Sequence, residues 1–253
     1  MRLKRSDPAG PGWTRRRHGT GFRYLDEHGK ALPADATKRV KALVIPPAWQ
    51  QVWICAHPDG HIQALGYDDA GRRQYLYHDQ WRTDRDAEKF DRVLKLAPKL
   101  KAFRDQVEHD MKSRGRKRAL ATALRMLDLG VFRVGHEQYV EENGTHGVTT
   151  LLREHLAVTD ARLAKALKPL LKGRAANDRV FDLTADDVND RFRDLVGDEY
   201  SAKDLRTWHA TVFAAQAFAR QPKPSRRAVS KVMKEVAENL GNTPAVASRN
   251  APC

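Results

Sequence analysis

The spacing of the apolar residues changes near residue 79, and this change constrains the fold more than any other feature of the chain. Before it, short segments rich in β-branched and aromatic residues alternate with the turn sequences "HPDG" and "DDAG", which is typical of antiparallel strands. These segments are "QVWICA", "HIQALGY" and "RRQYLYH". After it, apolar residues recur every three or four positions, as on the buried face of a helix. The sequence therefore predicts an α+β fold, in which a small antiparallel β-sheet precedes a larger, mainly α-helical part.

Helical spacing continues through most of the chain after residue 79. One predicted helix ends at Gly130, a residue type that favours the C-terminal end of a helix. Another begins at Thr184, whose side chain can cap a first turn in which Asp186 and Asp187 suit the helix dipole. These two carboxylates therefore indicate a helix start and not a metal site. The predicted helical segments are "DAEKFDRVLKL", "KLKAFRDQVEHDM", "RKRALATALRMLDLG", "TADDVNDRFRDLV" and "SRRAVSKVMKEVAENLG".

Three regions follow from these patterns. Residues 1–20 are basic and rich in Gly and Pro, with too few apolar residues to pack, so we expect a flexible tail. Residues 21–78 form the expected β-rich domain, and residues 79–253 form the expected helical domain. Cys55 and Cys253 are the only cysteines and lack the spacing of a zinc site, so we expect reduced thiols.

The chain carries 46 basic and 32 acidic residues, a formal net charge of +14. Such an imbalance favours polyanionic partners through long-range attraction and the release of counterions, and nucleic acid is the first candidate. No apolar run approaches the ~20 residues that a membrane span needs, and the basic N-terminus lacks the apolar core of a signal peptide. We therefore expect a cytoplasmic, nucleoid-associated protein that binds DNA and no membrane.

The helical segment "SAKDLRTWHATVFAAQAFA", residues 201–219, carries an arginine beside its apolar face. Arg206 lies about one turn from the predicted N-terminus, where free main-chain amides and the helix dipole already favour an anion. Together with Lys203 it could bind a phosphate. The alternative is an ordinary ion pair with Asp204 or with a carboxylate elsewhere, and the helix by itself favours this alternative.

A second set of candidate binding residues lies on the strand "RRQYLYH". The two-residue period of a strand places Arg73, Tyr75 and Tyr77 on one face, with Gln74 and Leu76 on the other. A face with an arginine and two tyrosines can pack on a duplex. Aromatic residues that cover the core of a small sheet would produce the same pattern, so both interpretations stay open at this point.

Four stretches of the chain form a larger pattern: "VIPPAWQQVWICAHPDGHIQALGYDDAGRRQYLYH", "FRVGHEQYVEENGTHGVTTLLREH", "YSAKDLRTWHATVFAAQAFA" and "VAENLGNTPAV". In order and rough spacing they resemble the type IB DNA topoisomerases of the compact bacterial and poxviral kind, from about Gly21 to Val246. The resemblance implies a β-rich N-terminal domain and a helical catalytic domain that close around duplex DNA as a clamp. We expect a monomer that needs no metal and no cofactor.

The resemblance assigns three residues to a phosphate clamp. Arg206 matches the arginine of the family's "KDLRT" motif and Arg133 matches that of "FRVG", while Asn242 of "GNTPAV" stands where poxviral members have His and many bacterial members have Asn. In the family, such arginines stabilise the charge that develops on the scissile phosphate without proton transfer. A tyrosine forms a 3′-phosphotyrosyl bond, and a lysine on a β-hairpin protonates the leaving 5′-oxygen.

The resemblance also assigns residues to the DNA surface. Family members use the matching positions in the major groove. The residues so assigned are Gln74, Tyr75, Tyr77 and Tyr139. His136 and Gln138 stand where poxviral relatives have lysines, so the preference for DNA sequence is expected to differ or to be weaker.

Two functional residues of the family have no match in these 253 residues. Few residues separate His155 from the next helical segment, "DARLAKALKPLLKG", which leaves no room for the lysine hairpin. All six tyrosines lie at or before Tyr200, and Ala251 stands at the nominal position of the nucleophile. We therefore expect a type IB topoisomerase with impaired activity. The alternative is a non-catalytic clamp that binds duplex DNA, and the N-terminal sheet argues against a tyrosine recombinase.

Overall fold

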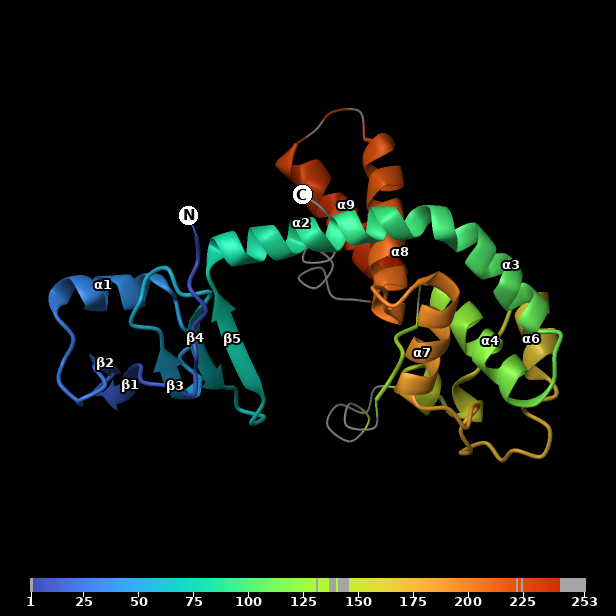
Figure 1. The fold of residues 1–253 in the computed structure, drawn as a ribbon, viewed down its shortest axis with the longest axis horizontal. Coiled ribbons are helices and arrows are strands. Elements are labelled where there is room, and N and C mark those ends of the chain that lie inside the picture. The colour runs from blue at the N-terminus through green and yellow to red at the C-terminus, as the bar shows by residue number, and fades with distance from the viewer. Residues whose placement is uncertain are drawn as a thin grey trace. The chain divides into compact units, whose positions relative to one another are not determined.

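A computed structural model of the chain describes residues 2–130, 132–136, 140, 146–221, 223 and 225–241. The chain divides into two compact units, Met1–Glu88 and Lys89–Cys253 (Figure 1). The first unit contains an antiparallel sheet and the second is helical, while helix α2 (Asp79–Leu96) begins in the first unit and ends in the second. The α+β class predicted from the sequence is confirmed, because strands and helices are segregated along the chain.

The first unit is built on a five-stranded antiparallel sheet with the strand order β2-β1-β3-β4-β5. Strands β3, β4 and β5 coincide with the three segments that the sequence marks as strands. Strands β2 and β5 form the two edges of the sheet. The strands are β1 (Trp13–His18), β2 (Gly21–Leu25), β3 (Gln50–Ile54), β4 (Ile62–Tyr67) and β5 (Arg73–Tyr77).

Strand β1 lies in the segment whose composition predicts a flexible tail, so that prediction is wrong for residues 13–18. This strand pairs with both β2 and β3. Closer to the N-terminus, the hydroxyl of Ser6 donates a hydrogen bond of 3.0 Å to the carbonyl of Ile62. Composition fails here because main-chain hydrogen bonds, which almost every residue can make, hold the segment together with one apolar side chain, Trp13, packed against the core.

The sequence patterns do not predict helix α1 (Ala34–Ala42), which packs on the sheet. Val40 of this helix is fully buried and shares a core with Val52, Ile54 and Ala64. Val40 is the one buried residue of α1. The helix therefore has too few apolar positions to show a helical period.

Helix α4 (Gly115–Asp128) is the central helix of the second unit. It packs against α3, α6, α7 and α8, and its Leu124 and Met126 side chains are fully buried. Packing on several sides therefore fixes the end of α4 and the chain that follows it. The surrounding helices are α3 (Leu100–Asp110), α6 (Ala161–Leu167), α7 (Ala185–Val196), α8 (Ala202–Ala219) and α9 (Arg226–Asn239). Short 3-10 turns are η1 (Ala97–Lys99), η2 (Val148–Thr150) and η3 (Arg153–His155).

The start of α7 confirms the predicted helix cap. The Thr184 hydroxyl accepts a hydrogen bond of 3.1 Å from the amide of Asp187, whose carboxylate accepts one of 2.8 Å from the amide of Thr184. Asp187 also pairs with Arg116 at 2.6 Å. The carboxylates of this segment thus serve the helix start. Within the part of the chain that the structure describes, no helix has both the length and the apolar character needed to cross a membrane.

A pair of phenylalanines joins α3 to α7 in the main core. The rings of Phe103 and Phe192 meet edge to face with centroids 5.3 Å apart, and the two residues are 1% and 0% exposed. Phe192→Ala should lower the free energy of unfolding by about 3–5 kcal/mol, since it removes a large ring and leaves a cavity. Urea denaturation followed by circular dichroism measures this loss. As a control, Leu94→Ala alters a residue that is 60% exposed and should change the value by less than about 0.5 kcal/mol.

Candidate phosphate-binding site

The first turn of α8 is closed by Asp204. Its carboxylate accepts hydrogen bonds from the amide and the hydroxyl of Ser201 at 2.9 and 3.1 Å. The same carboxylate pairs with Arg92 of α2 at 3.0 Å, and its side chain is 5% exposed. Asp204 therefore pairs with Arg92, in place of the pair with Arg206 that the sequence offers as an alternative.

Arg206 reaches from α8 to main-chain carbonyl groups of two other segments. Its Nη1 donates to the carbonyl oxygens of Gly130 and Phe132 at 3.2 and 3.5 Å. Its Nη2 donates to the carbonyl of Leu240, just after α9. These bonds to main-chain carbonyl groups fix the position of the guanidinium. Arg206 thus lies where the ends of α4 and α9 meet α8.

Arg133 lies on the segment that follows α4, and main-chain bonds hold this segment. Its carbonyl accepts a hydrogen bond of 2.8 Å from the amide of Val148. Two residues further on, Gly135 approaches Gly147 so closely that a Cβ on Gly147 would lie 2.4 Å from the Gly135 nitrogen. Only glycine fits this approach. The backbone of "FRVG" is therefore fixed, while the Arg133 side chain is exposed.

The two arginines lie within electrostatic reach of each other. Burial, and in second place the positive charge of Arg133, lower the pKa of Arg206 to about 10. Burial removes part of the hydration of the guanidinium, and a like charge nearby adds repulsion. An anion that binds between the two groups relieves this repulsion and forms charge-assisted hydrogen bonds with both. Arg133 and Arg206, far apart in the sequence, are thus close enough for their charges to interact.

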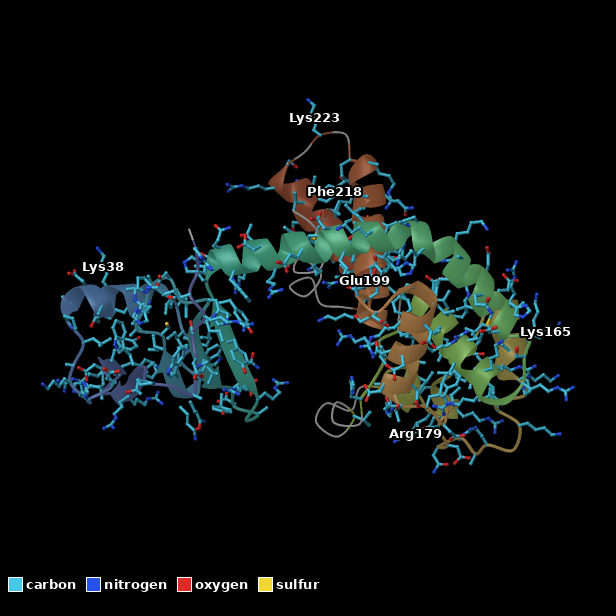
Figure 2. All side chains as sticks on the ribbon, viewed as in Figure 1. Lys38, Lys165, Arg179, Glu199, Phe218 and Lys223 are labelled. Carbon is cyan, nitrogen blue, oxygen red and sulfur yellow. The ribbon has the colours of Figure 1, made fainter. Side chains whose placement is uncertain are left out.

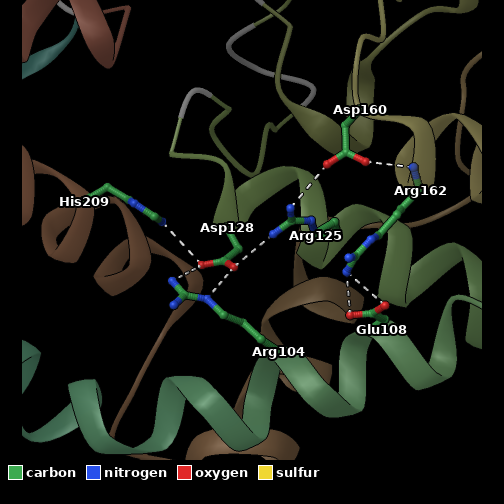
Figure 3. Close-up of polar contacts among 7 residues, drawn as sticks. All are labelled: Arg104, Glu108, Arg125, Asp128, Asp160, Arg162 and His209. Atoms are coloured by element: carbon green, nitrogen blue, oxygen red, sulfur yellow. Dashed lines mark hydrogen bonds and ion pairs between the residues drawn. The ribbon is translucent and has the colours of Figure 1, made fainter.

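A buried carboxylate at the end of α4 contacts side chains from three helices (Figure 3). Asp128, the last residue of α4, has a side chain that is 1% exposed and accepts hydrogen bonds of 2.8 and 2.9 Å from Arg104. Arg125 and His209 lie 3.5 and 3.3 Å from the same carboxylate. Burial by itself would raise the pKa of Asp128, but the hydrogen bonds from His209 and Arg104 outweigh it and hold the pKa below its usual value. The ionised carboxylate therefore ties α3, α4 and α8 together.

His209 also packs on the glycine that binds Arg206. Gly130 has a φ of +79°, and a Cβ there would lie 2.9 Å from the Cγ atom of His209. His209 follows Arg206 by about one turn of α8, so the ring packs on Gly130 while the guanidinium binds its carbonyl. The contact between Asp128 and His209 therefore sets the spacing of α4 and α8 at which Arg206 reaches this carbonyl.

The second unit contains further residues that the sequence predicts to bind DNA or phosphate. Lys203 is exposed on the first turn of α8, and His136 is exposed on the segment after Arg133. Three predicted residues lie outside the residues that the structure describes: Gln138, Tyr139 and Asn242. The structure therefore brings together Arg133 and Arg206 of the predicted phosphate clamp.

Strand β5 presents Arg73, Tyr75 and Tyr77 on one face, as the strand period predicts. The rings of Tyr75 and Tyr77 stack with centroids 5.8 Å apart, and the Arg73 guanidinium lies 5.5 Å from the centre of the Tyr75 ring. Leu76 packs against the core, whereas Tyr75 is partly buried and Tyr77 is 37% exposed. Gln74 donates a hydrogen bond of 3.0 Å to a carboxylate of the β4–β5 turn. The tyrosines thus leave aromatic surface accessible at a sheet edge, unlike aromatic residues that only cover a core.

Sequence reasoning does not identify Asp128 or His209. One local signal was available for Asp128, because an acidic residue at the C-terminal end of a helix opposes the helix dipole and needs another partner. His209 carries no such signal, since a histidine on a helix face is ordinary. Among the side chains that the structure describes, no group of three or more His, Cys, Asp or Glu could hold a metal ion.

Two family models match the chain. The model of the bacterial DNA topoisomerase IB N-terminal domain matches residues 21–68, and that of the eukaryotic DNA topoisomerase I catalytic core matches residues 78–163 and 158–252. The first match lies in the sheet unit, and the second covers most of α2 and the helical unit. The chain therefore belongs to the type IB DNA topoisomerase family.

Named relatives agree with this assignment. The DNA topoisomerase 1B of Acanthamoeba polyphaga mimivirus is 27% identical over 259 residues, which cover 87% of this chain and 75% of that protein. DNA topoisomerase 1 of Caenorhabditis elegans is 24% identical over 238 residues, or 74% of this chain and 28% of that protein. DNA topoisomerase 1 of Mycosarcoma maydis is 30% identical over 120 residues, or 45% of this chain and 12% of that protein. The chain thus spans a small part of the two eukaryotic relatives.

The charge of Asp128 can be removed without changing the shape of the side chain. Asp128→Asn should lower the free energy of unfolding at neutral pH by about 2–3 kcal/mol, because Arg104, Arg125 and His209 lose a shared anion but keep some access to water. Since the folded-state pKa is lowered, the carboxylate stabilises the fold above its unfolded pKa of ~3.9, and this contribution is lost as the pH falls through the folded pKa.

Urea unfolding at several pH values measures this effect. The difference between Asp128→Asn and the parent chain should shrink below about pH 4. Asp105→Asn provides the control, since Asp105 is 65% exposed in a surface pair with Lys101, and its loss should cost less than about 0.5 kcal/mol. A difference for Asp128→Asn that did not depend on pH would contradict the ionised, paired carboxylate.

The anion site gives a second prediction. Inorganic phosphate should raise the melting temperature of the chain, because a bound anion relieves the repulsion between Arg133 and Arg206. Arg206→Gln should remove most of this shift, whereas Arg114→Gln, at an exposed arginine, should preserve it. Thermal denaturation in phosphate and in chloride at equal ionic strength measures the shift. Equal shifts in both variants would show that phosphate acts only on the general surface charge.

Proposed function

We propose that this chain binds duplex DNA as a type IB topoisomerase does and holds a phosphodiester between Arg133 and Arg206. The observation that carries this proposal is that two cations from distant segments lie within electrostatic reach, with main-chain carbonyls fixing the more buried one. A phosphodiester attacked in line develops negative charge on its equatorial oxygens, and fixed arginines offset this charge without moving a proton. Asn242 would complete the clamp. Its place in the chain supports this role, because it follows Leu240, whose carbonyl binds Arg206.

We propose further that both units contact the duplex. In the first unit, the exposed face of Arg73, Tyr75 and Tyr77 supplies a cation and flat rings that can pack in a groove. In the second unit, Lys203 is exposed on the same turn of helix as Arg206. The net charge of +14 supports the binding of a long polyanion.

The 253 residues by themselves are proposed to cleave DNA poorly. Residues 156–160 connect η3 directly to α6, and no β-hairpin occurs among the described residues of this region. The two matches to the catalytic core overlap at residues 158–163. We expect the family's lysine hairpin in this region from the sequence resemblance. Lys165 lies on the side of the unit away from α8 (Figure 2), which supports the proposal that it does not replace that lysine. All six tyrosines lie at or before Tyr200, which leaves the nucleophile of the family without a match.

Relaxation of supercoiled plasmid without ATP or magnesium tests the proposal. A polypeptide of these 253 residues should bind plasmid and duplex tightly, with little relaxation and no covalent adduct on nicked or suicide substrates. Efficient relaxation would exclude the alternative function, a non-catalytic duplex-binding clamp. Weak binding that hardly depends on salt would contradict both functions, since both require contact with many phosphates.

The surface on β5 gives a prediction for binding. The double variant Tyr75→Ala/Tyr77→Ala should weaken duplex binding by about tenfold, or about 1.4 kcal/mol, because it removes two stacked rings from the proposed groove contact. Fluorescence anisotropy with a labelled duplex measures the affinity. Val44→Ala alters a residue that is 79% exposed in the same unit and should leave the affinity unchanged. Equal affinity for the double variant and the parent would remove β5 from the interface.

A further inference from the structure

A hollow of about 1080 Å³ opens on the second unit beside α6. Its walls come from residues 153–158 on one side and residues 164–175 on the other. A smaller cavity of about 110 Å³ shares Leu156 and Val158 with it. None of the described residues that line the hollow belongs to the proposed phosphate site, and Figure 2 shows Lys165 of its rim on the side of the unit away from α8. The hollow is therefore a separate surface of the unit.

The floor of the hollow is hydrocarbon. Leu156, Val158 and Leu171 are partly exposed in it, and Leu167 is buried beneath them. An apolar floor in contact with water favours an occupant with apolar groups of its own. The side chains of the floor offer no hydrogen-bond donors, so the floor does not suit a phosphate.

The rim of the hollow is basic and contains no acidic residue among the residues described there. Two of its cations hold the walls together, since Arg153 donates to the carbonyl of Arg174, and Arg174 pairs with Asp182. The other three cations of the rim form no ion pair with any residue that the structure describes. These are Lys165, Lys168 and Lys172.

The wall formed by α6 is anchored to neighbouring helices, so the hollow exists before anything binds. Asp160 caps α6 and pairs with Arg125 of α4 at 3.3 Å (Figure 3). Arg162 pairs with Glu108 of α3 at 3.0 Å. Both anchors lie at the start of α6, so they fix the helix that carries Lys165 and has Lys168 as its C-cap, while Lys172 lies in the turn that follows.

We propose that this hollow binds an acidic peptide segment of a partner protein, with apolar side chains on the floor and carboxylates against Lys165, Lys168 and Lys172. Charge complementarity selects this occupant, because only a chain that carries both apolar and acidic groups matches the floor and the rim together. Duplex DNA matches the rim alone, since its phosphates and sugars would lose water over the floor without gaining hydrogen bonds. The inference does not depend on the proposed topoisomerase function.

The experiment uses the full chain and arrays of peptides of about 15 residues, roughly four turns of helix. Three classes of peptide are compared. The first contains random sequences of Leu, Phe, Asp and Glu. The second has Ser in place of Leu and Phe, and the third has Lys and Arg in place of Asp and Glu. The chain should bind members of the first class at least about tenfold more tightly than any of the other two. Equal binding of the first two classes would overturn the proposal, because it would show attraction by net charge alone.

Variants then locate the site with the tightest peptide of the first class as a labelled probe. The triple variant Lys165→Glu/Lys168→Glu/Lys172→Glu should weaken its binding by about tenfold or more, and Leu171→Ser should weaken it in the same direction. A matched triple variant, Lys30→Glu/Lys38→Glu/Lys41→Glu in the first unit, makes the same change in net charge and should cost less than about twofold. Thermal denaturation of each variant checks that it is folded. Lys168→Ala repeats the peptide-binding test with a single substitution at an exposed residue.

Duplex binding is measured on the same variants. If the rim variant weakens duplex binding and leaves peptide binding intact, the surface belongs to the DNA interface and the proposal is wrong. Equal losses of peptide binding in the two triple variants would also overturn it. Normal duplex binding together with a loss of peptide binding confined to the rim variant supports it, whatever the outcome of plasmid relaxation.

Discussion

The ionised carboxylate of Asp128 organises the helical unit, because a carboxylate that is 1% exposed must find its partners inside the protein. Those partners come from α3, α4 and α8, so one buried charge fixes three helices relative to one another. The end of α4, with Gly130 and the segment of Arg133, follows directly from this position. The location of Arg206 depends on it in turn, since Arg206 binds the carbonyl of Gly130.

The surroundings of Arg206 differ from those of Asp128 in the sign of the nearby charge. Asp128 lies among cations, which lower its pKa and favour its ionised form. Arg206 is held by carbonyls near a second arginine, and its pKa falls to about 10 because burial and a like charge disfavour the protonated form. Perturbed pKa values of this kind are found often at binding sites, and also in structural networks of charged residues.

The region between η3 and α6 is a short connection that borders a separate surface of the helical unit. Residues 156–160 connect η3 directly to α6, and Leu156 and Val158 among them form part of the wall of a hollow with an apolar floor. Ion pairs from Asp160 and Arg162 anchor the adjoining helix to α4 and α3. The surface beside this connection is therefore built on a stable frame and has a chemical character unlike that of the arginine site.

The sequence by itself determines the class of fold, the order of strands and helices, the cap at Thr184, the helix end near Gly130 and the family motifs that contain Arg133 and Arg206. These features depend on short-range causes, namely apolar period, turn residues and helix caps. Strand β1, the pairing of Asp128 with His209 and the accessible rings of Tyr75 and Tyr77 were decided only in the tertiary structure. Each of them depends on neighbours that are close in the folded structure but distant in the sequence. The environment of a buried charge or of an edge strand depends on these distant residues. Local periodicity of the sequence does not reveal which residues they are.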